Sequence, residues 1–182
     1  MNRFISCKSI IYCMFLIALG VASCNITSTP KRLKLVDGEI DACLLVTPTE
    51  LETVTGFDTV ADSQPLNPSG TSCYYAKTDG NTALIIFVTT DETWKRNHRI
   101  GTAEDLYNFW RAEEPKHPEL YYTVEDVGDL GSQAYFSNRQ DYKLTVHVLN
   151  NGILYEFTGY STSDVNRDKL IQLAKIALER AP

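Results

Sequence analysis

Residues 142–160, YKLTVHVLNNGILYEFTGY, contain two runs of alternating apolar and polar residues joined by Asn151-Gly152. Asn-Gly favours the two-residue turn of a β-hairpin, because both central positions of that turn need a positive φ. In the second run, Ile153, Tyr155 and Phe157 occupy alternate positions and therefore share one face of a strand. The stretch predicts an antiparallel hairpin with one buried face.

Similar patterns predict more strands on both sides of this hairpin. Strands are expected at 72–77, 83–90, 121–127 and 133–138. Cys73-Tyr74-Tyr75 before one turn is echoed by Ala134-Tyr135-Phe136 before another. This weak internal repeat would divide the domain into two helix-plus-hairpin halves.

Three helical regions are expected between and after the strands. Thr47-Pro48-Thr49-Glu50 is a capped helix start, and Gly56 suits the left-handed stop. Residues 91–114 read as helix, interrupted at Gly101 and capped again at Thr102. A last apolar stripe over 170–181 predicts a C-terminal helix, with Ser161 or Ser163 as its cap.

These patterns predict an α+β fold, a single domain in which helices pack on an antiparallel sheet. Helices on one face would be enough to bury the core, because the other face of an antiparallel sheet can be exposed to solvent. In topology the outline is similar to the PsbP/Mog1-like architecture.

The N-terminal leader predicts where in the cell the protein is located. Arg3 and Lys8 precede a nearly unbroken apolar run over 10–22, which is shorter than the ~20 apolar residues of a membrane-spanning helix. The run ends in Val21-Ala22-Ser23-Cys24, which resembles the lipobox of bacterial lipoproteins. The resemblance implies cleavage before Cys24 and acylation of that residue. An uncut signal anchor with an ordinary thiol is the alternative.

We therefore expect a signal peptide at 1–23, a lipidated Cys24 with a polar tether through residue 41, and a globular domain at 42–182. The leader holds two of the 17 basic residues and none of the 23 acidic ones, so the remaining 159 residues have a net charge of −8. Such an acidic body argues against a nucleic-acid partner, which would need a basic face. The expected location is the cell membrane or the outer membrane, with the domain on the non-cytoplasmic side.

Cys43 and Cys73 are the two thiols that remain outside the leader and the lipidation site. An exported chain with an even number of thiols favours a disulfide between them. A metal site is disfavoured, since no third Cys or nearby His completes one.

The chain resembles small secreted bacterial lipoproteins of unknown function in four features. These are the lipobox leader, the polar tether, Cys43-x-Leu45 before the capped helix, and Cys73-x-Tyr75 at the start of a strand. Val127-Gly128-Asp129 leading to Ala134-Tyr135-Phe136 is also similar to theirs. The resemblance implies a lipid anchor and an α+β domain stapled by one disulfide, and it implies no activity.

No recognisable catalytic or cofactor motif appears in the sequence. His98, His117 and His147 lack ligand spacing, and Gly128-x-x-Gly131 is too short for a phosphate loop. Alternation places His147 opposite Val146 and Val148, on the face of its strand expected to be wetter. We therefore expect no catalytic residues, no metal and no cofactor.

A basic and aromatic spot is the best sequence candidate for a contact surface on this acidic chain. It comprises Trp94, Lys95, Arg96 and Arg99. Aromatic and Arg side chains are the usual anchors of interfaces. The expected function is a non-catalytic envelope domain that binds a partner protein or a small envelope ligand. An accessory or sensor subunit, or a hydrolase without a recognisable motif, is the alternative.

Overall fold

The computed structural model describes residues 32–56, 58–64, 70–77, 80–98, 101–139, 143–160 and 165–182. The leader, Cys24 and residues 25–31 of the predicted tether lie outside these residues. In chain order the described elements are η1 (Ala42–Leu44), α2 (Pro48–Thr55), β1 (Thr59–Gln64), β2 (Thr71–Lys77), β3 (Thr82–Thr90), α3 (Asp91–His98), α4 (Ala103–Glu113), η2 (Glu114–Lys116), β4 (Tyr121–Asp126), β5 (Gln133–Arg139), β6 (Lys143–Asn150), β7 (Ile153–Tyr160) and α5 (Arg167–Arg180).

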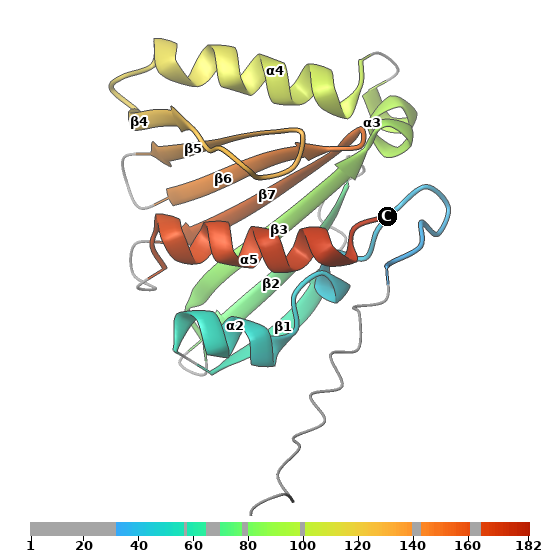
Figure 1. Cartoon of the computed structure of the whole chain (residues 1–182), viewed down its shortest axis with the longest axis vertical. Helices are drawn as coiled ribbons and strands as arrows, with labels where there is room; N and C mark the ends of the chain where they lie inside the picture. Colours follow the sequence, from blue (N-terminus) through green and yellow to red (C-terminus); the bar gives the residue numbers. More distant parts are fainter. Residues whose placement is uncertain are drawn as a thin grey trace, which may run out of the picture.

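The described strands form one antiparallel sheet in the order β1-β2-β3-β7-β6-β5-β4 (Figure 1). The predicted hairpin is the β6–β7 pair, which closes at Asn150 opposite Ile153. Asn151 and Gly152 have φ values of 51° and 71°, as a turn of this kind requires. The α+β class predicted from the sequence is confirmed.

One face of the sheet carries the main core. Val146 and Val148 of β6 and Tyr155 and Phe157 of β7 point into it, and all four are buried. Leu170, Leu173, Ala174 and Ala177 of α5 close the core from outside, with Leu51 of α2 beside them. Figure 1 shows α5 in front of the strands and α2 beside β1.

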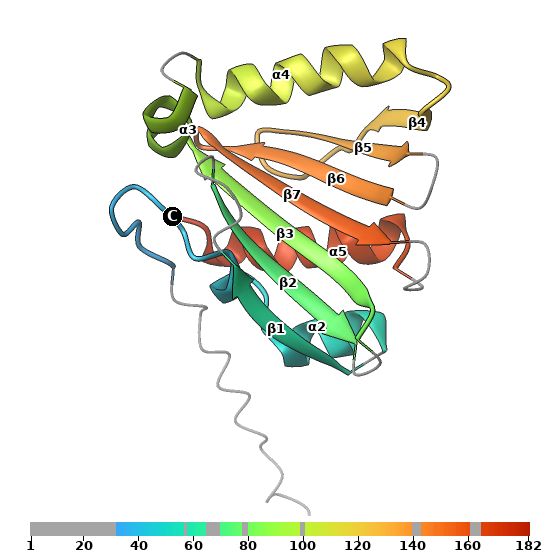
Figure 2. The same cartoon turned by 180° about the vertical axis from the view of Figure 1, so that it is seen from behind.

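The opposite face is partly covered by α4. Leu106 and Tyr107 of this helix pack against Tyr135, Leu149 and Leu154 of the sheet in a second, smaller core. The expectation of one wet face is therefore wrong where α4 lies. Over β2, β3 and the adjacent part of β7, the part of the chain that the structure describes places no helix on this face (Figure 2).

The predicted helix ends have mixed outcomes. Thr47 and Glu50 form the capping box of α2, Gly56 ends that helix with φ 84°, and Thr102 forms a second capping box at α4. The predicted serine cap of α5 is wrong. Asn166 is the cap, and its side-chain oxygen accepts from the Lys169 amide at 3.0 Å.

The N-terminal part of the domain is fastened to the sheet and to α5. The predicted Cys43–Cys73 disulfide is confirmed, with the Cα atoms 4.9 Å apart, and it ties η1 to β2. Arg180 of α5 donates to both carboxylate oxygens of Glu50, at 2.7 and 2.5 Å. The Leu33 amide donates to the Arg180 carbonyl at 2.7 Å, so the last part of the predicted tether lies along the domain.

No helix among the described residues has both the length and the apolar character needed to cross a membrane.

Candidate functional site

A polar hollow of about 300 Å³ lies beside α4 on the second face of the sheet. Side chains from β4, β5, β6, β7 and the α4–η2 junction meet there. The residues that line it are Trp110, Glu114, Tyr121, Ser137, Arg139, Lys143, Thr145, His147, Glu156 and Thr158.

Strand alternation places most of these residues together. On β6, Thr145 and His147 alternate with the core residues Val146 and Val148. The register sets Glu156 of β7 opposite His147 and sets Thr158 opposite Thr145. The same alternation that builds the apolar core on one face therefore gathers polar side chains on the other.

Glu114 enters the hollow from the helix side. It follows the last residue of α4 and begins η2, where Pro115 occupies the first turn. Only 8% of Glu114 is exposed, and its Oε1 lies 3.7 Å from His147 Nε2. A carboxyl group is thus held against the sheet by the end of α4.

His147 lies at the floor of the hollow and is 4% exposed. Its ring stacks on Tyr135 with the centroids 4.4 Å apart, and Trp110 meets it edge-on at 5.8 Å. His147 Nε2 lies 3.4 Å from Ser137 Oγ. Burial lowers the pKa of His147 to about 3, so the ring is neutral at pH 7.

The sequence expectation for His147, a surface residue on a wetter face, is therefore wrong. Alternation correctly places it opposite Val146 and Val148, but α4 and Trp110 cover that side of β6 as well. The alternation of side chains along a strand predicts which residues share a face of the sheet. It does not predict which other elements pack on that face.

The two carboxyl groups of the hollow are both hard to ionise. Burial raises the pKa of Glu114 to about 7, against the opposing effect of the Ser137 and Tyr135 hydroxyls and of the Arg111 and Arg139 guanidinium groups. Burial also raises the pKa of Glu156 to about 8; the charge of Glu114 adds to this shift and Lys143 opposes it. Near neutral pH each group can therefore be present in either protonation state.

Three buried polar atoms of this hollow have no hydrogen-bond partner among the described residues. They are Glu114 Oε2, Glu156 Oε1 and His147 Nδ1. A buried polar atom without a partner costs roughly 1–3 kcal/mol, and such atoms are few in folded proteins. Three in one hollow indicate a place where a ligand's polar groups would complete the bonding.

The hollow continues along the uncovered part of the sheet. A second hollow of about 610 Å³ shares Lys143, Glu156 and Thr158 with it, and reaches Tyr74 and Phe87 on β2 and β3. We call the two together the sheet groove. Its lining residues on the sheet come mainly from β2, β3, β6 and β7, and Figure 2 shows these strands from the side opposite α5.

The groove does not contain a complete nucleophilic triad. Ser137 Oγ and Glu114 Oε1 both approach the same nitrogen of His147, Nε2, whereas a triad needs the acid on the opposite nitrogen. Among the residues that the structure describes, no group of three His, Cys, Asp or Glu residues is placed to hold a metal ion.

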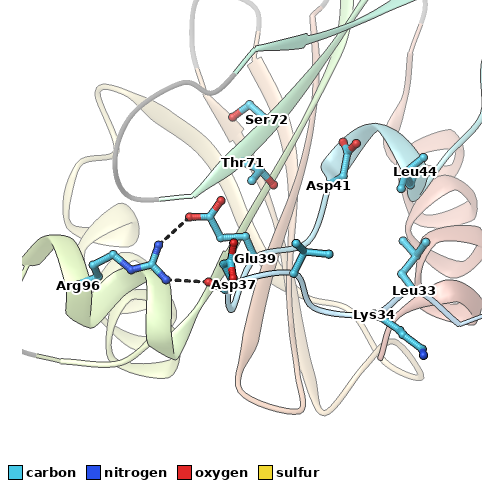
Figure 3. A pocket seen from close by; sticks show the side chains of 10 residues that line it. Leu33, Lys34, Asp37, Glu39, Asp41, Leu44, Thr71, Ser72 and Arg96 are labelled. Atoms are coloured by element: carbon cyan, nitrogen blue, oxygen red, sulfur yellow. Dashed lines mark hydrogen bonds and ion pairs between the residues drawn. The ribbon is translucent and has the colours of Figure 1, made fainter.

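The sequence-predicted contact surface lies elsewhere, at the end of α3. Lys95 and Arg96 are exposed and Trp94 is half-buried, while Arg99 lies outside the described residues. Arg96 donates to Glu39 Oε1 at 3.1 Å and to the Asp37 carbonyl at 2.7 Å (Figure 3). Arg96 therefore holds the N-terminal segment, and the contact surface at Trp94, Lys95, Arg96 and Arg99 stays a prediction.

A further hollow of about 520 Å³ lies between this N-terminal segment and the start of β2. Figure 3 shows Glu39, Asp41, Leu44 and Thr71 lining it, with the ion pair of Arg96 and Glu39 at one side.

The two remaining histidines lie outside the sheet groove. His117 is exposed and lies 3.2 Å from Glu119, and the side chain of His98 is outside the described part.

The sequence did contain a signal for the sheet groove. Glu156 and Thr158 interrupt an otherwise apolar run, as Thr145 and His147 do on the neighbouring strand. The hairpin turn fixes their register, so the four residues could be placed together from the sequence. Glu114 could not, because its place depends on the packing of α4.

Comparisons with protein-family models, with curated proteins and with solved structures find no match for this chain. The internal repeat, the PsbP/Mog1-like outline and the resemblance to secreted lipoproteins therefore stay predictions.

Proposed function

We propose that this chain is a lipid-anchored envelope protein whose domain binds a small ligand, without catalysis, in the sheet groove. The anchor rests on the lipobox resemblance at Cys24, and the binding role rests on the groove. One observation carries it: Glu114 Oε2, Glu156 Oε1 and His147 Nδ1 are buried in a single hollow with no partner among the described residues.

The size and lining of the groove support the same proposal. Ligand sites are usually concave, measure some 300–1,000 Å³ and combine aromatic walls with a few convergent polar groups. The two hollows fall in this range, and Trp110, Tyr121, Tyr74 and Phe87 supply aromatic walls. Small-ligand binding is favoured over a protein partner because the groove is recessed and its unpartnered atoms lie beneath the surface.

A groove-filling variant tests this proposal. Thr158 lines both hollows, so Thr158→Trp should fill their junction while leaving the core on the opposite face intact. The full chain, solubilised from its membrane in mild detergent, would be screened by thermal shift against sugars, polyamines, amino acids and phosphate. The matched control is Glu52→Trp on the exposed side of α2.

We expect at least one compound to raise the melting temperature of the wild type and of Glu52→Trp, and to have no effect on Thr158→Trp. An equal rise in all three proteins would place binding outside the groove. No rise with any compound would also contradict the proposal.

A second function, acid–base hydrolysis, is favoured by one specific observation. Glu114 and Glu156 have pKa values raised to about 7 and 8 in one hollow, and perturbed carboxyl groups of this kind are typical of general acids and bases. Turnover of any compound that binds, lost in both Glu114→Gln and Glu156→Gln, would establish it.

A further inference from the structure

The chemistry of the sheet groove restricts the class of ligand that it can bind, if the groove is the binding site proposed above. We infer that the ligand is an uncharged saccharide of two or more rings. Three features of the groove support this inference: its hydrogen-bonding groups, its charge balance and its aromatic walls.

The hydrogen-bonding groups of the groove match hydroxyl groups. A protonated carboxyl donates one hydrogen bond and still accepts, and so does each of the Ser137, Thr145 and Thr158 hydroxyls. A sugar hydroxyl has the same double capacity and can satisfy Glu114 Oε2 or Glu156 Oε1 in either protonation state. A ligand with only donors or only acceptors would match one state alone.

The charges around the groove balance once Glu114 and Glu156 ionise, and the groove then opposes a strongly charged ligand. Arg139 is exposed and Lys143 is half-buried, whereas Glu114 and the Oε1 atom of Glu156 are buried. A polyamine would approach the two cations, and a phosphate would approach the two carboxyl groups once they ionise. A neutral, hydroxyl-rich molecule avoids both penalties.

The aromatic side chains suit the flat apolar faces of sugar rings. Trp110 and Tyr121 stand in the first hollow, and Tyr74, Phe87 and Tyr160 stand in the second. Aromatic rings present broad apolar faces at low conformational cost, against which the C–H groups of a sugar can pack. The two hollows, of about 300 and 610 Å³, share Lys143, Glu156 and Thr158, so together they offer space for more than one ring.

Calorimetric titration of the full detergent-solubilised chain tests the class directly. The probes are trimers of β-1,4-linked N-acetylglucosamine, glucose and mannose, the matching monosaccharides, spermidine and inorganic phosphate. We expect at least one trimer to bind, and to bind more tightly than its monosaccharide. Spermidine and phosphate should not compete.

Tyr74→Ala separates a chain of rings from a single ring. Tyr74 is half-buried and lines only the second hollow, so its loss should weaken the trimer about tenfold and leave the monosaccharide unchanged. Thr158→Trp should abolish both, and Glu52→Trp should change neither.

The outcomes distinguish the two levels of the proposal. If spermidine or phosphate binds and Thr158→Trp abolishes that binding, while no saccharide binds, then the groove is a ligand site and the saccharide assignment is wrong. If no probe shows binding that depends on Thr158, both the saccharide assignment and the proposed binding function fail.

Discussion

Glu156 brings a carboxyl group to the middle of the sheet. It stands in the middle of β7, opposite His147 and Phe87, and its Oε1 is buried without a partner among the described residues. A strand built only for stability would carry an apolar or hydroxyl-bearing residue here. Its presence is therefore better explained by a ligand than by folding.

Burial of Glu156 makes stability depend on pH in a defined direction. Its pKa rises from 4.5 to about 8 on folding, so the folded state holds this proton more tightly than the unfolded chain does. The free energy of unfolding should therefore fall as pH rises from about 4.5 to 8. The pKa of Glu114, raised to about 7, adds to the same trend.

Glu156→Gln removes the ionisation and keeps the shape. We expect the variant to be more stable than wild type by about 1–3 kcal/mol at pH 9 and equal to it near pH 4, because only the ionised carboxylate is penalised. Urea unfolding across this pH range measures the difference. The exposed Glu52→Gln is the control, and parallel stability curves for wild type and Glu156→Gln would refute the assignment.

The helices and strands differ in how far they could be predicted. Thr47 with Glu50, and Thr102 with Asp105, specify the starts of α2 and α4 because each pair forms a local capping box. The prediction for the cap of α5 was wrong because several polar residues precede the helix in the sequence, and the one at the capping position is Asn166, directly before Arg167. Local rules therefore identified elements better than their ends.

The packing between elements was harder to predict from the sequence than the elements themselves. The hairpin register follows from Asn151-Gly152, yet the coverage of the second face depends on Leu106 and Tyr107 reaching Leu149 and Leu154. Those contacts join segments some 45 residues apart and leave no local pattern. The half of the groove built by strands could thus be predicted, and the half built by α4 could not.

The Cys43–Cys73 disulfide should make a large contribution to the stability of the domain. It closes a loop of 30 residues and links η1 to the buried Cys73 of β2. On the chain-entropy account, removing it in Cys43→Ala/Cys73→Ala should cost roughly 3–4 kcal/mol. Chemical unfolding with and without reductant measures this. Reductant should lower wild-type stability by a similar amount and leave the variant unchanged; an effect below 1 kcal/mol would contradict the bridge's role.

For the whole molecule, the proposal joins an anchor at one end to a binding groove on the folded domain. The described chain begins at residue 32, and it meets the C-terminal end of α5, where the Leu33 amide donates to the Arg180 carbonyl. Arg32 lies only eight positions after Cys24 in the chain. A lipid at Cys24 would therefore hold the domain within about 30 Å of the membrane, given ~3.4 Å per extended residue.

The anchor itself is tested by labelling cells with a tagged fatty acid. We expect label on the wild type and on Cys43→Ala/Cys73→Ala, and none on Cys24→Ala, which should also leave the membrane fraction, since acyl chains supply the attachment. Label retained on Cys24→Ala would mean that this residue is not the lipidation site.

The central claim is that the second face of the sheet, beside α4, is where this protein meets its ligand. The most direct measurement is an amide NMR titration of the isotope-labelled full chain in detergent micelles with the trimer that binds best by calorimetry. We expect the largest shifts at Ser137, Thr145 and Thr158, on three adjacent strands. Shifts concentrated instead at residues 33–44 and Arg96, around the N-terminal hollow, would contradict it.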